Sequence, residues 1–435
     1  MAKKTTGKPA ERQIDRSVLL NGVTVWTERV PRTQGAAVGL WIRGGSRYED
    51  LKEAGVTHML QRIALWGTEN RSAVQVGNAI EKLGGDVEYH TARDHAGWLS
   101  RSKDWKGALE LISDLTRFPA ITKEAIDAES AALLEELSAD EKNPDFDLDR
   151  MYLRSLWKGH GLCRAPRGRL LEIKGNLRLE DFKPKSLVRF QRESVHPSGL
   201  TVVAVGDVKH DEVVAQAEKL FGEMEEPKKT VSTTTPTPFK VFAMRSRTGL
   251  EGVRMQVGVP AFGAGDERRY TAAILNALVG GGPESRLTRM LASGELEATE
   301  VRSSLDLYED VGSFSVRLFM EREHASSVLT SVVGLMRKLA HLPVEDDELA
   351  AAKAHVHGEA AARLETIKTR VADLLRQELY FGRVLDPAAE ADLVDRTTSE
   401  QVRMLASEWV APHTLSVAML GDLKGVVVSP SILRW

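Results

Sequence analysis

Short apolar runs alternate with helix-like segments along the chain, and this pattern predicts a mixture of strands and helices. A brief run of β-branched apolar residues indicates a strand, and apolar residues at every third or fourth position indicate a helix. In the first half these rules predict strands over 19–27, 36–43 and 87–100, the last with an internal turn, and helices over 54–66, 73–83, 105–118 and 123–140. Gly84 and Gly85 are expected to end the second helix. This order favours a mixed sheet covered by helices on one face.

Part of the pattern occurs twice. Residues 198–209 read Ser-Gly-Leu-Thr-Val-Val-Ala-Val-Gly-Asp-Val-Lys, and residues 413–424 read His-Thr-Leu-Ser-Val-Ala-Met-Leu-Gly-Asp-Leu-Lys. Each segment is typical of a buried strand that enters a turn at Gly-Asp. The apolar segments 36–43 and 255–260 form a second pair, and each is followed by a polar turn and a helical pattern. The repeat predicts two homologous α+β domains.

A polar stretch separates the two halves. Residues 223–238 carry three prolines and almost no large apolar side chains, which is typical of an exposed linker. We therefore expect a flexible tail over 1–16, a first domain over 17–222, a linker over 223–238 and a second domain over 239–435.

Net charge, apolar runs and the cysteine count exclude several classes of protein. The 435 residues carry a formal net charge of −3, so no general positive field attracts nucleic acid. No apolar run of about 18 residues predicts a membrane span, and no apolar stretch after the first lysines predicts a secretory signal. Cys163 is the sole cysteine, so an internal disulfide is excluded. We expect a bacterial cytoplasmic protein, with the mitochondrial matrix and the periplasm left open.

The helix predicted over 54–66 carries polar residues at a spacing that can serve catalysis. His58 and Arg62 are four residues apart and share a helix face, with Gln61 beside them. A His-x-x-Glu-His helix uses this geometry for two zinc ligands and a general base. Glu129 and Glu136 also share a face of a later helix. Taken alone, these residues would be an ordinary boundary histidine and a solvated acidic face.

Several segments together carry a family resemblance. They are the stretch around His58, the turn at 44–49, its continuation at 63–68, the turn at 83–85, the helix at 129–136 and the glycine-rich segment at 280–287. In this order the chain resembles the insulinase and pitrilysin zinc peptidases, which include mitochondrial processing peptidase and the core proteins of the respiratory cytochrome b–c complex. The resemblance covers nearly the whole chain and implies a paired-domain peptidase fold.

The chain differs from this family at the positions that bind zinc and supply the general base. The resemblance matches the first zinc ligand to His58 and the third to Glu136, but it puts Gln61 at the catalytic glutamate and Arg62 at the second histidine. Two protein ligands remain where catalytic zinc needs three, and glutamine cannot act as a general base. We therefore expect neither a catalytic residue nor a metal in this chain. We also expect the Arg62 guanidinium to pair with Glu136 in place of the metal.

The positions that would contact substrate are altered as well. Alignment on the glycine-rich segment places Ala292 and Thr299 where active relatives carry an arginine and a tyrosine, although Arg302 and Tyr308 are left open as substitutes. Glu88 stands where the edge strand of the family has an asparagine. The candidate substrate-chamber residues are Glu88, Gly280, Gly281, Gly282 and Arg286, and the three glycines are interpreted as a flexible turn or a gating loop.

The resemblance implies a non-catalytic subunit of a heterodimeric peptidase. A homologous partner chain would supply the zinc site, and this chain would form half of the chamber that binds the peptide substrate. Two alternatives remain open: a structural protein like the respiratory core proteins, and a scaffold that binds a peptide without cutting it.

Overall fold

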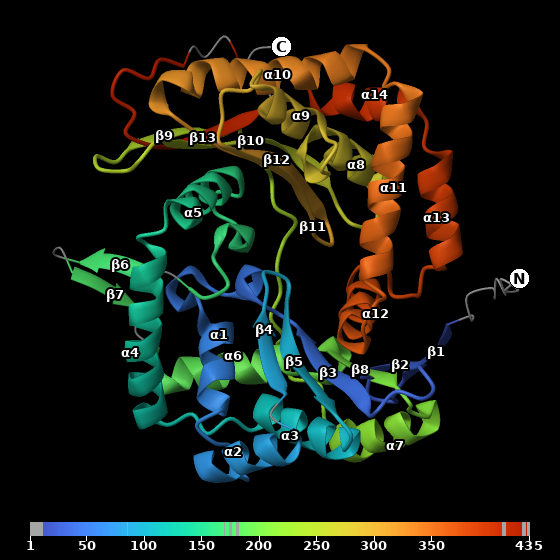
Figure 1. Cartoon of the computed structure of the whole chain (residues 1–435). Coiled ribbons are helices and arrows are strands. Elements are labelled where there is room, and N and C mark those ends of the chain that lie inside the picture. The colour runs from blue at the N-terminus through green and yellow to red at the C-terminus, as the bar shows by residue number, and fades with distance from the viewer. Residues whose placement is uncertain are drawn as a thin grey trace, which may run out of the picture.

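The computed structural model describes residues 12–84, 86–168, 170–173, 176–179, 182–410, 415–428 and 432. These residues form two α+β domains, each built on a mixed sheet (Figure 1). The first sheet contains β1 (Gln13–Val18), β2 (Thr24–Arg29), β3 (Ala36–Arg43), β4 (Val87–Thr91), β5 (His95–Ser102) and β8 (Leu200–Gly206). The second contains β9 (Phe242–Ser246), β10 (Val253–Phe262), β11 (Glu300–Leu307), β12 (Val311–Met320) and β13 (Ser416–Gly421). A separate hairpin joins β6 (Leu170–Ile173) to β7 (Asn176–Leu179). The predicted fold class is confirmed.

The two sheets repeat one topology. The first has the order β1-β2-β8-β3-β5-β4, and the second, taken from its other edge, has the order β9-β13-β10-β12-β11. In both sheets one pair is parallel, β2 with β8 and β9 with β13, and the remaining corresponding pairs are antiparallel. β8 and β13 contain the two segments that end in Gly-Asp, and they occupy matching positions. Only β1 has no counterpart.

The chain between residues 13 and 29 differs from its prediction. The expected single strand over 19–27 is two strands, β1 and β2, because the chain turns between them, where the Leu19 N–H donates to the Val23 carbonyl over 2.8 Å. β1 begins at Gln13, so part of the expected tail pairs with the sheet; residues 1–11 lie outside the described residues. Residues 225–240, within and just after the predicted linker, form neither helix nor strand. Gly85, His413 and Thr414 also lie outside the described residues.

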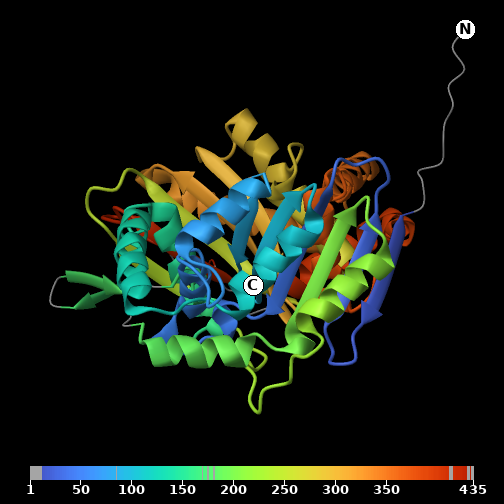
Figure 2. The same cartoon turned by 90° about the horizontal axis from the view of Figure 1, so that it is seen from below.

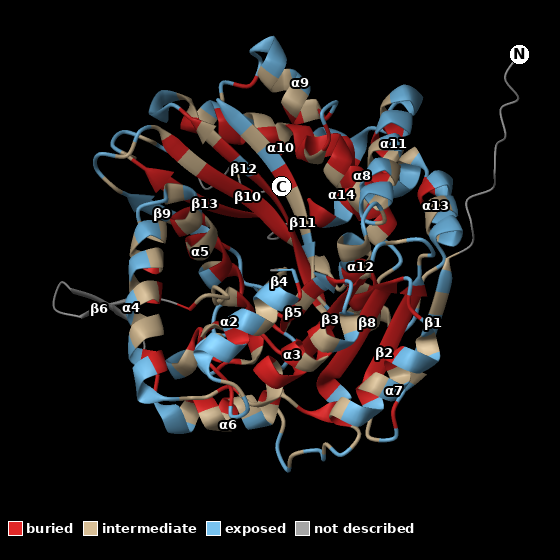
Figure 3. Ribbon diagram, turned by 60° about the horizontal axis from the view of Figure 1, so that its bottom comes forward, coloured by how far each residue is buried: buried red, intermediate tan, exposed pale blue. Residues whose placement is uncertain are grey.

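The helices of each domain pack on one face of its own sheet or on the helices that cover that face. In the first domain they are α1 (Val56–Ala64), α2 (Ala73–Lys82), α3 (Trp105–Arg117), α4 (Lys123–Asp140), α6 (Pro184–Ser194) and α7 (His210–Phe221), and the view from below shows helices lying across that sheet (Figure 2). In the second domain they are α8 (Arg269–Asn276), α9 (Arg286–Ser293), α10 (Ala325–His341), α11 (Asp346–Ala362), α13 (Pro387–Arg396) and α14 (Ser399–Trp409). The central strands are buried in both domains (Figure 3).

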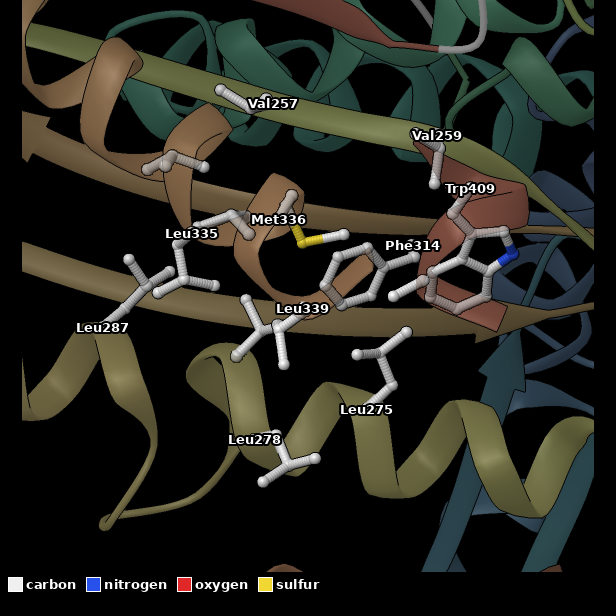
Figure 4. Packing of buried hydrophobic residues seen from close by; sticks show 14 of the residues in the cluster. Val257, Val259, Leu275, Leu278, Leu287, Phe314, Leu335, Met336, Leu339 and Trp409 are labelled. Atoms are coloured by element: carbon white, nitrogen blue, oxygen red, sulfur yellow. The ribbon is translucent and has the colours of Figure 1, made fainter. Parts of the chain in front are cut away.

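The second-domain core shows how the layers meet. The Phe314 ring of β12 stacks on the Trp409 indole of α14, with 5.0 Å between the centroids. Met336 and Leu339 of α10 and Leu275 of α8 surround this pair (Figure 4). Burial of such aromatic and aliphatic side chains stabilises the domain by about 2 kcal/mol each.

Each domain also sends one helix to the sheet of the other. α5 (Pro144–Leu156) packs against β10 and β13, and α12 (Ile367–Phe381) packs against β3 and β8 (Figure 1). Leu148 and Leu156 of α5 share a buried cluster with Leu420 of β13. The sheets are therefore covered on both faces, with the second face supplied by the opposite domain. This exchange fixes the two domains against one another.

Candidate functional site

The helix that carries the zinc-like motif is held at its N-terminus by a buried carboxylate. Gly55 precedes α1 in a left-handed conformation, with φ of 94°. The Glu49 carboxylate accepts hydrogen bonds from the backbone N–H groups of Gly55 at 2.7 Å and Thr57 at 3.0 Å. These bonds satisfy free donors of the first turn. Burial raises the pKa of Glu49 to about 7. The turn at 44–49 thus fixes where α1 begins.

His58 is buried between α1 and the edge strand β4. Its Nδ1 lies 3.2 Å from the Thr91 hydroxyl, and its ring packs 5.6 Å from the Tyr89 ring. Nε2 is buried and has no hydrogen-bond partner among the described residues. Burial, together with the nearby Arg62 charge, lowers the pKa of His58 to about 4. The imidazole is therefore neutral at pH 7.

Gln61 is a structural brace in this geometry. Its amide nitrogen donates to the Gly97 carbonyl at 2.9 Å and to the His90 carbonyl at 3.1 Å. Its amide oxygen accepts a hydrogen bond from the Thr91 hydroxyl. A glutamate could not make the two donations at neutral pH, because an ionised carboxylate only accepts. The glutamine thus ties α1 to the β4–β5 hairpin.

Arg62 lies between the two glutamates of α4. Its Nε donates to Glu129, and its Nη1 donates to both oxygens of Glu136 at 2.8 and 3.0 Å. The Trp66 indole N–H also donates to Glu129 at 2.6 Å. The Arg62 side chain is 12% exposed and that of Glu136 is 41% exposed. The expected pairing of Arg62 with Glu136 is present, and it also includes Glu129.

This site does not fit a zinc ion. The Arg62 guanidinium binds the carboxylates that a metal would bind, and arginine cannot serve as a ligand. No group of three or more histidine, cysteine, aspartate or glutamate side chains able to hold a metal occurs in the described part of the chain. A cation is nevertheless present between the glutamates, since the guanidinium carries the positive charge.

The neutral His58 predicts a specific loss of stability in acid. Folding lowers its pKa from the ordinary 6.5 to about 4, so the folded state binds fewer protons and stability falls as the pH drops from 6.5 towards 4. Between pH 7 and pH 5 this effect amounts to about 2 kcal/mol. His58→Gln is expected to lose that much less stability over this range than the unaltered chain. Urea unfolding at both pH values measures it.

The control for this prediction is His341→Gln, because His341 is exposed. That variant should keep the full acid loss. Equal pH dependence of the unaltered chain and His58→Gln would contradict the assignment of a neutral, buried imidazole.

Comparisons with known proteins place this geometry in a family. The model of insulinase (peptidase family M16) matches residues 24–165, and that of the peptidase M16 inactive domain matches residues 181–356. The chain belongs to the insulinase peptidase family. The first match contains the α1–α4 site, and the second contains most of the second domain.

Relatives of this insulinase-family chain span nearly its whole length. It is 27% identical to an uncharacterized zinc protease of Mycobacterium bovis, with 92% of this chain and 90% of that protein covered. It is 24% identical to a probable mitochondrial-processing peptidase subunit beta of Schizosaccharomyces pombe, with 99% and 97% covered.

Solved structures share its fold. A protease from Helicobacter pylori matches with a TM-score of 0.84 and 19% identity, covering 94% of this chain and all of that one. A peptidase M16 inactive domain protein from Pseudomonas fluorescens matches with a TM-score of 0.85 and 16% identity, covering 96% and 100%.

In this insulinase-family chain, the second-domain candidates lie on different elements. Ala292 lies in α9, and Thr299 immediately precedes β11. Arg302 is exposed on β11, whereas Tyr308 lies in the β11–β12 turn beside Arg93 of the first domain. Arg302 and Tyr308 are six residues apart along an extended strand, or about 20 Å. Their use as substitutes for the missing arginine and tyrosine stays a hypothesis.

The remaining candidate chamber residues are engaged in other contacts. Glu88 pairs with Lys368 of α12 at 3.0 Å, and Arg286 makes two hydrogen bonds of 2.8 Å to Glu348 of α11. Residues 277–281 form a π-helical segment in which Gly280 is buried, so Gly280 and Gly281 are helical and do not form the expected turn, and Gly282 follows as the C-cap. A Cβ at Gly280 would lie 3.1 Å from the Ser303 backbone nitrogen, a tight contact that a larger residue could make only if β11 shifted slightly.

Sequence reasoning missed three residues of the site. Thr91 and Tyr89 of β4 contact His58, and Trp66 completes the bonds of Glu129. Trp66 lies in the continuation of the motif at 63–68, and its indole N–H is the signal that marks it as a hydrogen-bond donor to the site. Nothing in the sequence pairs β4 with α1, because that contact depends on how the sheet and helix layers pack.

Proposed function

We propose that this chain is the non-catalytic subunit of a heterodimeric zinc peptidase. The observation that carries the proposal is the ion cluster of Arg62 with Glu129 and Glu136. In this arrangement the site keeps its shape without a metal, because the guanidinium supplies the positive charge. A homologous partner chain supplies the zinc and its general base.

The residues at this site cannot activate a water molecule. Peptide hydrolysis in such enzymes needs a metal that lowers the pKa of bound water and a carboxylate that takes the proton. Gln61 donates two hydrogen bonds, and its amide cannot take up a proton at neutral pH. His58 faces Thr91 and Tyr89, and a single histidine does not make a zinc site.

The edge strand β4 offers a surface for an extended peptide. It pairs only with β5, so one of its edges has no partner strand among the described residues. In the hairpin, the Ala92 N–H donates to the His95 carbonyl over 2.8 Å. Hydrogen-bonded pairs alternate along an antiparallel ladder, which directs the N–H groups of Val87, Tyr89 and Thr91 to the free edge. A peptide strand can pair there, as in other peptide-binding sheets.

Peptide cleavage combined with metal analysis tests the proposal. The chain alone is expected to be free of zinc and inactive. Mixed with a relative from the same organism that carries an intact His-x-x-Glu-His motif, it should raise cleavage above that of the relative alone. Stoichiometric zinc with cleavage by the chain alone would refute the proposal. An absence of any effect in the mixture would favour a structural or peptide-binding role. We expect the pair in the bacterial cytoplasm, without a nucleic-acid partner.

The edge-strand part of the proposal has its own test. Val87→Pro removes an N–H that points to the free edge, and proline is tolerated at the first residue of a strand. We expect cleavage by the mixture to fall about tenfold, the cost of one or two backbone hydrogen bonds. Val87→Thr keeps the N–H and the branched side chain, so it serves as the matched control. Equal activity of both variants would show that the peptide does not pair with β4.

A further inference from the structure

A cavity in the second domain lies away from the α1 site. It occupies about 340 Å³ where α8, α11, α12 and α13 meet beside β11 (Figure 1). α12 reaches across to the first-domain sheet, and the cavity lies between this helix and the domain to which it belongs. Its volume falls in the range of small-molecule sites in proteins.

The wall of the cavity has an apolar part and a cationic part. The apolar part includes Ala273, Leu305, Val356, Leu364 and Val394. The cationic part contains four arginines from different segments of the chain, and three carboxylates line the same wall. The arginines are Arg12, Arg269, Arg363 and Arg376, and the carboxylates are Glu359, Asp373 and Glu390. This combination suits a molecule with an apolar body and an acidic group.

Arg269 has no carboxylate partner among the residues that the structure describes. Its Nη2 donates to the Tyr270 hydroxyl at 2.5 Å, and its Nη1 donates to the backbone carbonyl of Asp266 at 3.2 Å. Its Nε is buried and without a hydrogen-bond partner among the described residues. Tyr270 in turn donates to Glu390 at 3.0 Å, so the hydroxyl stands between the guanidinium and that carboxylate.

Within the described residues, Arg376 shares its carboxylate partner with other arginines. Asp373 lies 3.3 Å from Arg376, 3.5 Å from Arg12 and 3.9 Å from Arg363. It also accepts a hydrogen bond of 2.7 Å from Gln377. The Nε of Arg376 is buried and has no partner in the described part of the chain. Arg12 is also paired with Glu28, over 2.7 and 3.0 Å, so Asp373 serves mainly Arg363 and Arg376, and donors of these two guanidiniums stay unused.

The two arginines with unpartnered Nε groups both lie beside the aromatic ring of Phe381. The guanidinium carbon of Arg269 is 4.8 Å from the Phe381 ring centroid, and that of Arg376 is 5.7 Å from it. A buried guanidinium donor without a partner destabilises the folded chain. An acidic group beside Phe381 would face both guanidiniums, and its charge would offset theirs through bonds to their Nη groups, which are stronger than bonds between neutral groups.

We infer that this cavity binds a small carboxylic acid with an apolar body. The carboxylate lies between Arg269 and Arg376, and the apolar body contacts the side chains of α8, α11 and β11. The volume accommodates roughly ten to fifteen non-hydrogen atoms. The acid connects α8 to α12, and thereby holds α12 in place against its own domain. This inference does not depend on the proposed role in a heterodimer.

Two pairs of probes test the chemistry and the source of the acid. Calorimetric titration of the full chain compares octanoate with octanamide, and N-acetyl-phenylalanine with its amide. Each acid is expected to bind at least about tenfold more tightly than its neutral amide. Tighter binding of octanoate would indicate a free fatty acid, and tighter binding of N-acetyl-phenylalanine would indicate the carboxyl end of a peptide. Equal binding of acid and amide, or no binding up to about 10 mM acid, would overturn the inference.

Four variants locate the site. Arg269→Met and Arg376→Met should each weaken binding of the acid about tenfold or more. Ala273→Leu fills part of the cavity while leaving both arginines in place, and it should also weaken binding. Arg396→Met removes an exposed arginine that pairs with Asp392 elsewhere on α13, so its affinity should be unchanged. Thermal melting of each variant establishes that it is folded. Unchanged affinity in folded Arg269→Met, Arg376→Met and Ala273→Leu would place the acid elsewhere and refute the site.

Discussion

Replacing Gln61 with glutamate and Arg62 with histidine is expected to turn the ion cluster into a zinc site. The double variant should retain about one zinc ion per chain after dialysis against metal-free buffer, whereas the unaltered chain should retain almost none. His58, the new histidine and Glu136 would supply three ligands. α1 and α4 already bring position 62 next to Glu136, since the Arg62 Nη1 lies 2.8 Å from a Glu136 carboxylate oxygen. Metal analysis by mass spectrometry measures the content.

The same variant should depend on zinc for its stability. Without metal it loses the guanidinium between Glu129 and Glu136 and the two donations from Gln61 to backbone carbonyls. Loss of a cation that pairs partly buried carboxylates costs about 2 to 4 kcal/mol. Added zinc should restore the melting temperature, since metal binding stabilises the folded state.

Two controls separate zinc ligation from adventitious binding. Arg62→His alone should also bind zinc, because the glutamate at position 61 acts as a base and not as a ligand. Adding His58→Gln to the double variant should abolish zinc retention, since two ligands do not make such a site. Zinc content in the double variant no higher than in the unaltered chain would show that α1 and α4 no longer present ligands at a usable distance.

Leu374→Ala is expected to destabilise the whole chain by about 3 kcal/mol. Leu374 of α12 is 0% exposed and packs with Trp26, Trp41 and Val203 of the opposite domain. Its truncation leaves a cavity in a packed core, which costs about 2 to 5 kcal/mol. Urea unfolding followed by tryptophan fluorescence and by circular dichroism measures the loss.

Leu393→Ala is the matched control, because Leu393 of α13 is 40% exposed. It should cost less than about 1 kcal/mol. Weakening the contact of α12 should also uncouple the domains, so the two optical transitions of Leu374→Ala should separate where those of the control coincide. A loss below 1 kcal/mol for Leu374→Ala would show that α12 contributes little to the union of the domains.

Local patterns predicted many of the elements closely. The strand over 36–43 and the helix over 123–140 have the predicted ends, because apolar periodicity and capping residues act within a few positions. The two segments that end in Gly-Asp became β8 and β13 in matching places. The residues at 58, 61, 62 and 136 were enough to predict that an arginine would stand where a zinc ligand belongs.

The sequence alone therefore determined the doubled fold, its elements and the altered motif, because each depends on residue identity and short spacing. Only the tertiary structure decided which surfaces meet. Apolar periodicity shows that one face of α5 or α12 is buried, but not that the opposite domain buries it. In the same way, the bonds of Gln61 to His90 and Gly97, and the cavity between Arg269 and Arg376, join residues that are far apart along the chain. Their contact arises from the packing of layers, which no local pattern records.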